Sequence, residues 1–159
     1  MMQRKSADEW FDEYSVCHRH PMNKLVHWVC VPAITLCVLA LLWALPVPTF
    51  MSNTSDWFNW AVVVTVLSLI FYARLSPIIA IGMGIFSGSC LTLIRYYEQL
   101  QPDLLWPTAL VVFVVAWVGQ FVGHKIEGRK PAFFQDLQYL LIGPAWLLGF
   151  IYRRVGVRY

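Results

Sequence analysis

Long apolar runs separated by short polar stretches dominate the sequence. Four of these runs contain no charged residue, and each is close to the length of a membrane-spanning helix. An α-helix needs roughly 20 apolar residues to cross a bilayer. The pattern therefore predicts a bundle of four membrane-spanning helices, at residues 28–45, 57–73, 75–94 and 104–123.

Two shorter elements flank the predicted spans. Within the polar stretch 1–20, Tyr14 follows Trp10 by four positions and Phe11 by three, so the three residues share one face of an amphipathic helix. That face can lie on the membrane surface or cover a site. Near the other end, the apolar stretch 139–152 is too short for a full span and contains Gly143-Pro144, which favours a re-entrant or interfacial helix. The predicted fold is an all-α membrane protein forming one integral domain over residues 1–159.

The first spanning helix is expected to begin at Pro21. Proline suits the first helical turn because its missing N–H has no partner there, and His20 is then placed to cap the helix. Asn23 and His27 are four residues apart, so they share a face of this helix. Asn23 can either hydrogen-bond a metal-binding histidine or satisfy the open end of the helix.

Composition supports a membrane protein. The chain is 58% hydrophobic and only 13% charged, with a mean hydropathy of +0.58. Soluble domains average about 25% charged residues, so these charges are too few to cover a water-facing surface. The polar stretch 1–25 lacks the apolar core of a cleavable signal peptide. The four cysteines show no Cys-x2-Cys spacing, which argues against a zinc ribbon.

The distribution of Lys and Arg predicts the topology. With four crossings and both termini in the cytoplasm, 11 of the 12 basic residues lie on the cytoplasmic side and only Arg95 lies outside. A fifth crossing at 139–152 would change this to 8 against 4, which the positive-inside rule disfavours. A bacterial inner membrane and an endoplasmic reticulum both suit this topology. The basic residues form no dense patch with stacking aromatics, so a nucleic-acid partner is not expected.

Pairs of small residues in two spans indicate close helix packing. The third span contains Gly84-x3-Gly88 and the fourth contains Gly119-x3-Gly123. Small residues four positions apart let helix backbones approach each other closely in lipid. The pattern predicts that these two spans pack against each other. The oligomeric state stays open, a homo-oligomer included.

All four histidines lie at the ends of predicted spans. His18, His20 and His27 precede the first span, and His124 follows the fourth. An even number of crossings puts them on one membrane face, where they can build a metal site. Imidazole suits iron, zinc, copper and nickel, and the residue count alone does not choose among these metals. His20 is better interpreted as a helix cap than as a ligand.

A carboxylate accompanies the last histidine. His124 and Glu127 are three residues apart and project to one side of a continuing helix, with Gln120 one turn earlier. Helical iron proteins present paired Glu and His in a similar way. Glu127 is either part of such a site or an ordinary ion-pair partner of Arg129 or Lys130 in a solvated loop.

Other chemistries lack their motifs. The chain has no His-Glu-x2-His zinc motif, no Gly-x-Ser-x-Gly nucleophile elbow and no Gly-rich phosphate loop. Membrane lipid hydroxylases and desaturases carry many closely spaced histidine pairs, and four histidines argue against that class. A transporter would favour ionisable groups at mid-span, and the spans contain none. A structural membrane protein without enzymatic activity stays open.

Two motifs carry a resemblance to a known family. The first is Tyr-x3-His-x2-Pro-x-Asn-x3-His, from Tyr14 to His27, followed by Val31-Pro32. The second is Gln-Phe-Val-Gly-His with a later Glu and Pro-Ala, from Gln120 to Ala132. In combination they resemble the membrane-bound 2-hydroxy fatty acid dioxygenase family. The likeness runs from about Phe11 to Gly149.

The resemblance implies an activity and a set of site residues. It implies an Fe(II)-dependent α-oxidation that uses O2 to convert a 2-hydroxy long-chain fatty acid to a fatty acid one carbon shorter, in the degradation of the sphingoid base phytosphingosine. The metal ligands that it implies are His18, His27 and His124. Glu127 is then a fourth ligand or a base beside the metal. Arg129 or Lys130 can pair with the substrate carboxylate, although both also satisfy the positive-inside rule, and Asn23 is a further candidate for contact with the substrate.

Overall fold

A computed structural model describes residues 5–128 and 138–159, and these residues are helical apart from turns and connections. The all-α prediction is therefore confirmed for the described part of the chain. The elements, in chain order, are α1 (Ala7–Ser15), α2 (Pro21–Trp43), α3 (Thr49–Thr54), α4 (Trp60–Leu75), α5 (Pro77–Leu100), the 3-10 turn η1 (Pro102–Leu104), α6 (Leu105–Glu127) and α7 (Tyr139–Val155).

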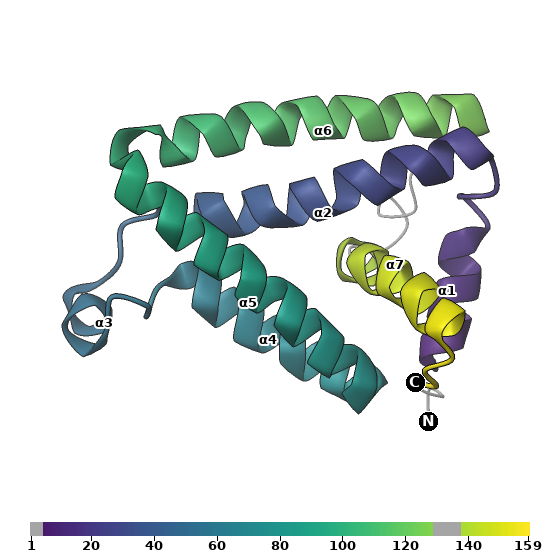
Figure 1. Cartoon of the computed structure of the whole chain (residues 1–159), viewed down its shortest axis with the longest axis horizontal. Helices are drawn as coiled ribbons and strands as arrows, with labels where there is room; N and C mark the ends of the chain where they lie inside the picture. Colours follow the sequence, from purple (N-terminus) through teal and green to yellow (C-terminus); the bar gives the residue numbers. More distant parts are fainter. Residues whose placement is uncertain (1–4, 129–137) are drawn as a thin grey trace.

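The helices form two pairs that diverge from each other (Figure 1). Helices α2 and α6 lie side by side along most of their length, and α4 and α5 form the second pair. Helix α7 lies between α2 and α5, with α1 packed beside it. Both termini lie at the same end of the molecule, and α3 lies at the opposite end. Helices α2, α4, α5 and α6 run in alternating directions, so the chain returns along α6 to the end at which it began.

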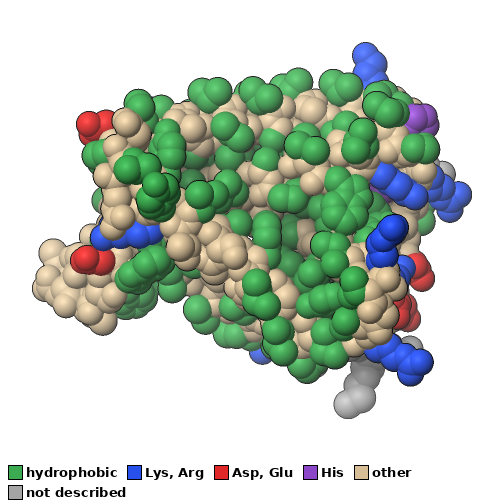
Figure 2. All heavy atoms as spheres, in the orientation of Figure 1, with side chains coloured by type: hydrophobic (Ala, Val, Ile, Leu, Met, Phe, Trp, Pro, Cys, Tyr) green, Lys and Arg blue, Asp and Glu red, His purple; other side chains and the backbone are tan. Residues whose placement is uncertain are grey.

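Within residues 5–128 and 138–159, three helices are long and apolar enough to cross a membrane. They are α2, α5 and α6, the last counted from Pro102. Helix α4 is apolar but has only 16 residues. The structure therefore supports three of the four predicted spans, and the count of four stays a prediction. Figure 2 shows hydrophobic side chains over the sides of the molecule and Lys and Arg gathered near the termini, as expected for helices that face lipid.

Local sequence signals determine where α2 and α6 begin and end. The Nδ1 atom of His20 accepts a hydrogen bond from the backbone N–H of Met22, so His20 caps α2 and Pro21 is its first residue, as predicted. Helix α6 ends at Glu127 and is capped by Gly128, whose φ of +73° is in the left-handed region that glycine adopts without strain. His124 and Glu127 are thereby placed in the last turn of α6.

The predicted packing of the third span on the fourth is wrong. A Cβ atom added to Gly119 or Gly123 would meet side chains of α2, among them Asn23, and one added to Gly84 would meet only Leu69 of α4. A Cβ at Gly88 would meet nothing within 4 Å. The small residues of α6 therefore serve the α2–α6 contact, because the chain pairs its first and last long helices.

Helices α1 and α7 pack against each other and against the long helices. Trp10, Phe11 and Tyr14 are buried, which confirms the predicted apolar face of α1. Part of that face meets α7, where the rings of Trp10 and Tyr139 are 5.4 Å apart in an edge-to-face contact. Helix α7 continues through Pro144 and is not among the helices long and apolar enough to span. The two helices lie at the end of the molecule that holds the termini, where α7 contacts both α2 and α5 (Figure 1).

Candidate metal centre

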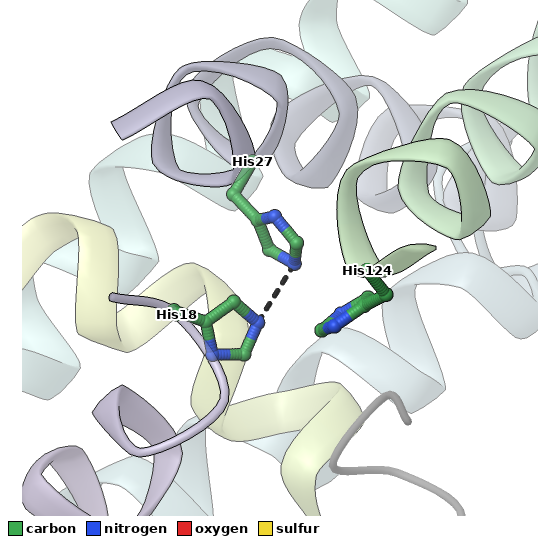
Figure 3. A group of neighbouring side chains, drawn as sticks. All are labelled: His18, His27 and His124. Carbon is green, nitrogen blue, oxygen red and sulfur yellow. Dashed lines mark hydrogen bonds between the residues drawn. The ribbon is translucent and has the colours of Figure 1, made fainter. Parts of the chain in front are cut away.

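Three of the four histidines meet in the interior of the protein (Figure 3). His18 comes from the connection between α1 and α2, His27 from α2 and His124 from α6. All three are buried, and one ring nitrogen of each lies within 4.8 Å of the others. His20 is exposed at the start of α2 and takes no part. The structure brings together the three histidines of the two motifs and separates the fourth.

Backbone carbonyls orient two of the three rings. The Nδ1 atom of His18 donates to the carbonyl oxygen of Tyr14, and the Nδ1 atom of His27 donates to that of Asn23 at 2.9 Å. A carbonyl oxygen can only accept a hydrogen bond, so each Nδ1 carries a proton. In a neutral ring the Nε2 atom is then a bare acceptor. The two Nε2 atoms lie 2.9 Å apart and face each other.

Two facing lone pairs need a cation between them. A proton could serve only if one ring were charged, and burial, with the neighbouring His27 ring, lowers the pKa of His18 to about 3. A metal ion satisfies both nitrogens without charging either ring. Ring N–H groups that donate to backbone carbonyls are the usual support of metal-binding histidines. The three imidazoles therefore fit a transition metal, with iron, zinc, copper and nickel all compatible with this donor set.

Aromatic rings hold His18 in place. The Tyr14 ring stacks on the His18 ring, with centroids 4.1 Å apart and planes inclined by 14°. The Trp146 ring of α7 lies 5.3 Å from the same imidazole. Helices α1 and α7 therefore form one wall of the site. Of the two placements that the sequence left open for the apolar face of α1, the structure shows the one that covers a site.

Glu127 lies beside the metal centre and anchors the connection that carries His18. Its carboxylate accepts hydrogen bonds from the backbone N–H groups of Arg19 at 3.0 Å and His20 at 2.7 Å. A third bond comes from the Asn23 side chain at 3.3 Å. Glu127 is not among the residues whose ligand atoms lie within 4.8 Å of one another, and its role as a fourth ligand stays a prediction. Arg129 and Lys130 lie outside the described residues.

Asn23 links the three chain segments of the site. Its side chain is fully buried, and its Nδ2 group donates to the Cys17 carbonyl at 3.1 Å as well as to Glu127. Its own backbone carbonyl accepts from His27. Among the described residues, nothing hydrogen-bonds its Oδ1 atom. The amide thus fixes the residues next to His18 against α2 and α6, a role that the sequence did not predict.

A cavity opens beside two of the histidines. Its volume is about 60 Å³, and residues of α1, α2, α6 and α7 line it, including His27 and His124. Gln120 lies in its wall, one turn before His124 as the spacing predicts. The burial of this amide next to the site is visible only in the structure. The cavity gives a small molecule access to the face of the metal centre.

Comparisons with known proteins agree with this site. Residues 4–155 match the Mpo1-like family, described as 2-hydroxy-palmitic acid dioxygenase Mpo1-like. The chain is 30% identical over 138 residues to 2-hydroxy-palmitic acid dioxygenase MPO1 of Saccharomyces cerevisiae, a match that covers 85% of this chain and 73% of the relative. No solved structure matches the chain. The chain belongs to the Mpo1-like family of 2-hydroxy-palmitic acid dioxygenases, as its two motifs predict.

Proposed function

We propose that the protein is a membrane-bound, Fe(II)-dependent dioxygenase that shortens 2-hydroxy long-chain fatty acids by one carbon. The observation that carries the proposal is the pair of facing Nε2 atoms of His18 and His27, with His124 beside them. The family and its yeast relative, a 2-hydroxy-palmitic acid dioxygenase, supply the substrate class. Iron is the metal among those compatible with imidazole whose ferrous form suits work with O2.

The reaction balances without a further reductant. One 2-hydroxy acid and one O2 give one shorter fatty acid, one CO2 and one water. The carbon that bears the hydroxyl becomes the new carboxyl group, and the bond to the old carboxyl carbon breaks. All electrons that O2 accepts come from the substrate. No flavin, nicotinamide or electron-transfer partner is therefore required in this proposal.

The residues of the chain hold the reactants and exclude water. His18, His27 and His124 would hold the iron, which supplies the redox chemistry that joins O2 to the substrate. Their burial keeps bulk water from the reacting atoms. The apolar helices α2 and α6 leave the alkyl chain of the substrate in contact with lipid-like surroundings. In this arrangement the substrate reaches the site from the bilayer, with both termini of the protein on the cytoplasmic side.

Metal content tests the proposal first. The detergent-purified protein should contain iron after anaerobic purification, and His124→Ala should lose most of it. His20→Ala is the matched control, because His20 is exposed and lies outside the cluster. The iron-loaded protein should convert 2-hydroxypalmitic acid and O2 to the acid with one carbon less, measured by mass spectrometry. Undiminished iron in the His124 variant, or no product from the loaded protein, would overturn the proposal.

A further inference from the structure

Gln120 is a buried amide without a partner among the described residues. It lies in α6, a helix long and apolar enough to span a membrane, and only 5% of its surface is exposed. No described residue hydrogen-bonds its side chain, although an amide offers two donor N–H groups and one acceptor oxygen. Burying an amide without hydrogen bonds is unfavourable, and it is more so in lipid than in a soluble protein. A ligand that supplies the missing bonds would remove this cost.

The side chain lies in the wall of the cavity that reaches the histidines. His27 and His124 line the same cavity, and none of its described lining residues is Lys or Arg. Its volume of about 60 Å³ suits a few water-sized groups, since one water needs roughly 10 to 15 Å³. This space fits a carboxylate with a neighbouring hydroxyl group and not a long alkyl chain. The alkyl chain of a bound 2-hydroxy fatty acid must therefore leave the cavity towards the bilayer.

We propose that the Gln120 amide binds the carboxylate of the substrate and selects free acids over their esters. The inference rests on the proposed function, because it assigns the polar end of a 2-hydroxy fatty acid to this cavity. The amide N–H groups donate to a carboxylate oxygen, which is a charged acceptor and gives the stronger kind of hydrogen bond. A neutral amide also avoids the cost of placing a basic residue within the membrane.

The alternative role for a polar residue in a spanning helix is to bridge two helices. Gln side chains often hydrogen-bond across helix interfaces in membranes. The contact between α2 and α6 is instead made by small residues, Gly119 and Gly123, which approach side chains of α2. The Gln120 side chain forms no bond to any described residue of α2 or α7. The bridging role therefore has no partner in the described structure.

Anaerobic binding of two ligands tests the assignment. The iron-loaded protein is titrated with radiolabelled 2-hydroxypalmitic acid and with its methyl ester. Gln120→Met keeps the length of the side chain and removes its donors, so it should weaken binding of the acid by about 10- to 100-fold. Binding of the ester should not change. Gln120→Glu should bind the acid more weakly still, because two carboxylates then meet, and both variants should keep their iron.

Thr65→Val is the matched control. Thr65 is a second buried polar residue in a helix, its Oγ1 atom has no hydrogen-bond partner among the described residues, and it lies in α4 away from the cavity. This variant should bind both ligands as the parent does. Unchanged acid binding in both Gln120 variants, an equal loss for acid and ester, or loss of iron would overturn the assignment. A parent protein that binds the acid and does not oxidise it would instead overturn the proposed function alone.

Discussion

Two backbone carbonyls determine how His18 and His27 can be used. Because each Nδ1 donates to a carbonyl, both rings present Nε2 to the centre of the site. The carbonyls belong to Tyr14 and Asn23, each four residues before its histidine, so the helical geometry of α2 supplies the partner of His27 and the turn that follows α1 supplies the partner of His18. The orientation of both rings thus has a physical reason that does not depend on the metal and that any residue type at positions 14 and 23 would supply through its backbone carbonyl.

Asn23→Asp should weaken metal binding without removing a ligand. The substitution replaces the Nδ2 donor by an oxygen that faces two acceptors, the Cys17 carbonyl and the Glu127 carboxylate. The connection that carries His18 then loses the bond that ties it to α2, and α2 loses its bond to Glu127 of α6. Loss of an outer partner of this kind lowers metal affinity by about 10- to 100-fold.

Competition with a chelator of known iron affinity measures the change. Asn53→Asp, at an exposed position of α3, makes the same chemical change away from the site and should leave the affinity unaltered. Parent-like iron affinity in Asn23→Asp would show that the amide does not position His18.

At the scale of helices, the close contact of α2 with α6 brings His27 and His124 together. Their ring centroids are 5.0 Å apart, and this requires the two backbones to approach closely. Gly123, next to His124 in sequence, makes room for the Asn23 side chain. The glycine pair of α6 thus contributes to the site by allowing the helix contact, although it carries no functional group.

Gly123→Ala should destabilise the protein by about 1–3 kcal/mol, the usual cost of overpacking. The added Cβ would lie 2.5 Å from the Asn23 Oδ1 atom and 3.3 Å from Val26. Asn23 cannot move away easily, because its amide is held by two hydrogen bonds.

Gly88→Ala is the control for Gly123→Ala, since a Cβ there meets nothing within 4 Å, and alanine favours a helix over glycine by about 1 kcal/mol. Thermal unfolding in detergent should give a lower midpoint for Gly123→Ala and an equal or higher one for Gly88→Ala. Equal midpoints in the two variants would contradict the tight contact.

The sequence predicts single elements better than their pairing. The start of α2 follows from His20 and Pro21, which act through neighbouring backbone groups. The pairing of α6 with α2 does not follow from the Gly-x3-Gly spacing. The same spacing occurs in α5, and it does not identify the helix that packs against it. Likewise the sequence predicts that the four histidines lie on one membrane face. It favours a capping role for His20 but does not exclude His20 from the metal site. The positions of Asn23 and Gln120 depend on contacts between helices far apart in sequence.

At the scale of the whole molecule, charge and helix arrangement are both compatible with the predicted orientation. The termini lie together, and α3 lies at the far end (Figure 1). Arg95, the one basic residue expected outside, forms salt bridges with Glu98 at 2.9 Å and Asp56 at 3.6 Å. Its positive charge is thereby offset by two carboxylates at that end. This arrangement suits the predicted topology, in which basic residues lie on the cytoplasmic side.

Helix α4 is the element on which this topology depends. Its 16 residues are about 24 Å long, shorter than the roughly 30 Å hydrocarbon core, although local thinning of the bilayer can accommodate a short helix. Three exposed positions separate the possibilities when each is changed to cysteine: Asn53 in α3, Arg74 at the end of α4 and Arg158 near the C-terminus.

With four crossings, a membrane-impermeant maleimide added to spheroplasts should label Asn53→Cys at once. The variants Arg74→Cys and Arg158→Cys should be labelled only after permeabilisation. The parent chain gives the background, since Cys17, Cys37 and Cys90 are buried and Cys30 is half-buried. If intact spheroplasts label Arg74→Cys as well as Asn53→Cys, α4 does not cross the membrane. If they label Arg158→Cys and Asn53→Cys but not Arg74→Cys, α7 does cross it. The first result would place His124 on the other side of the membrane from the one proposed. The second would place the C-terminus there.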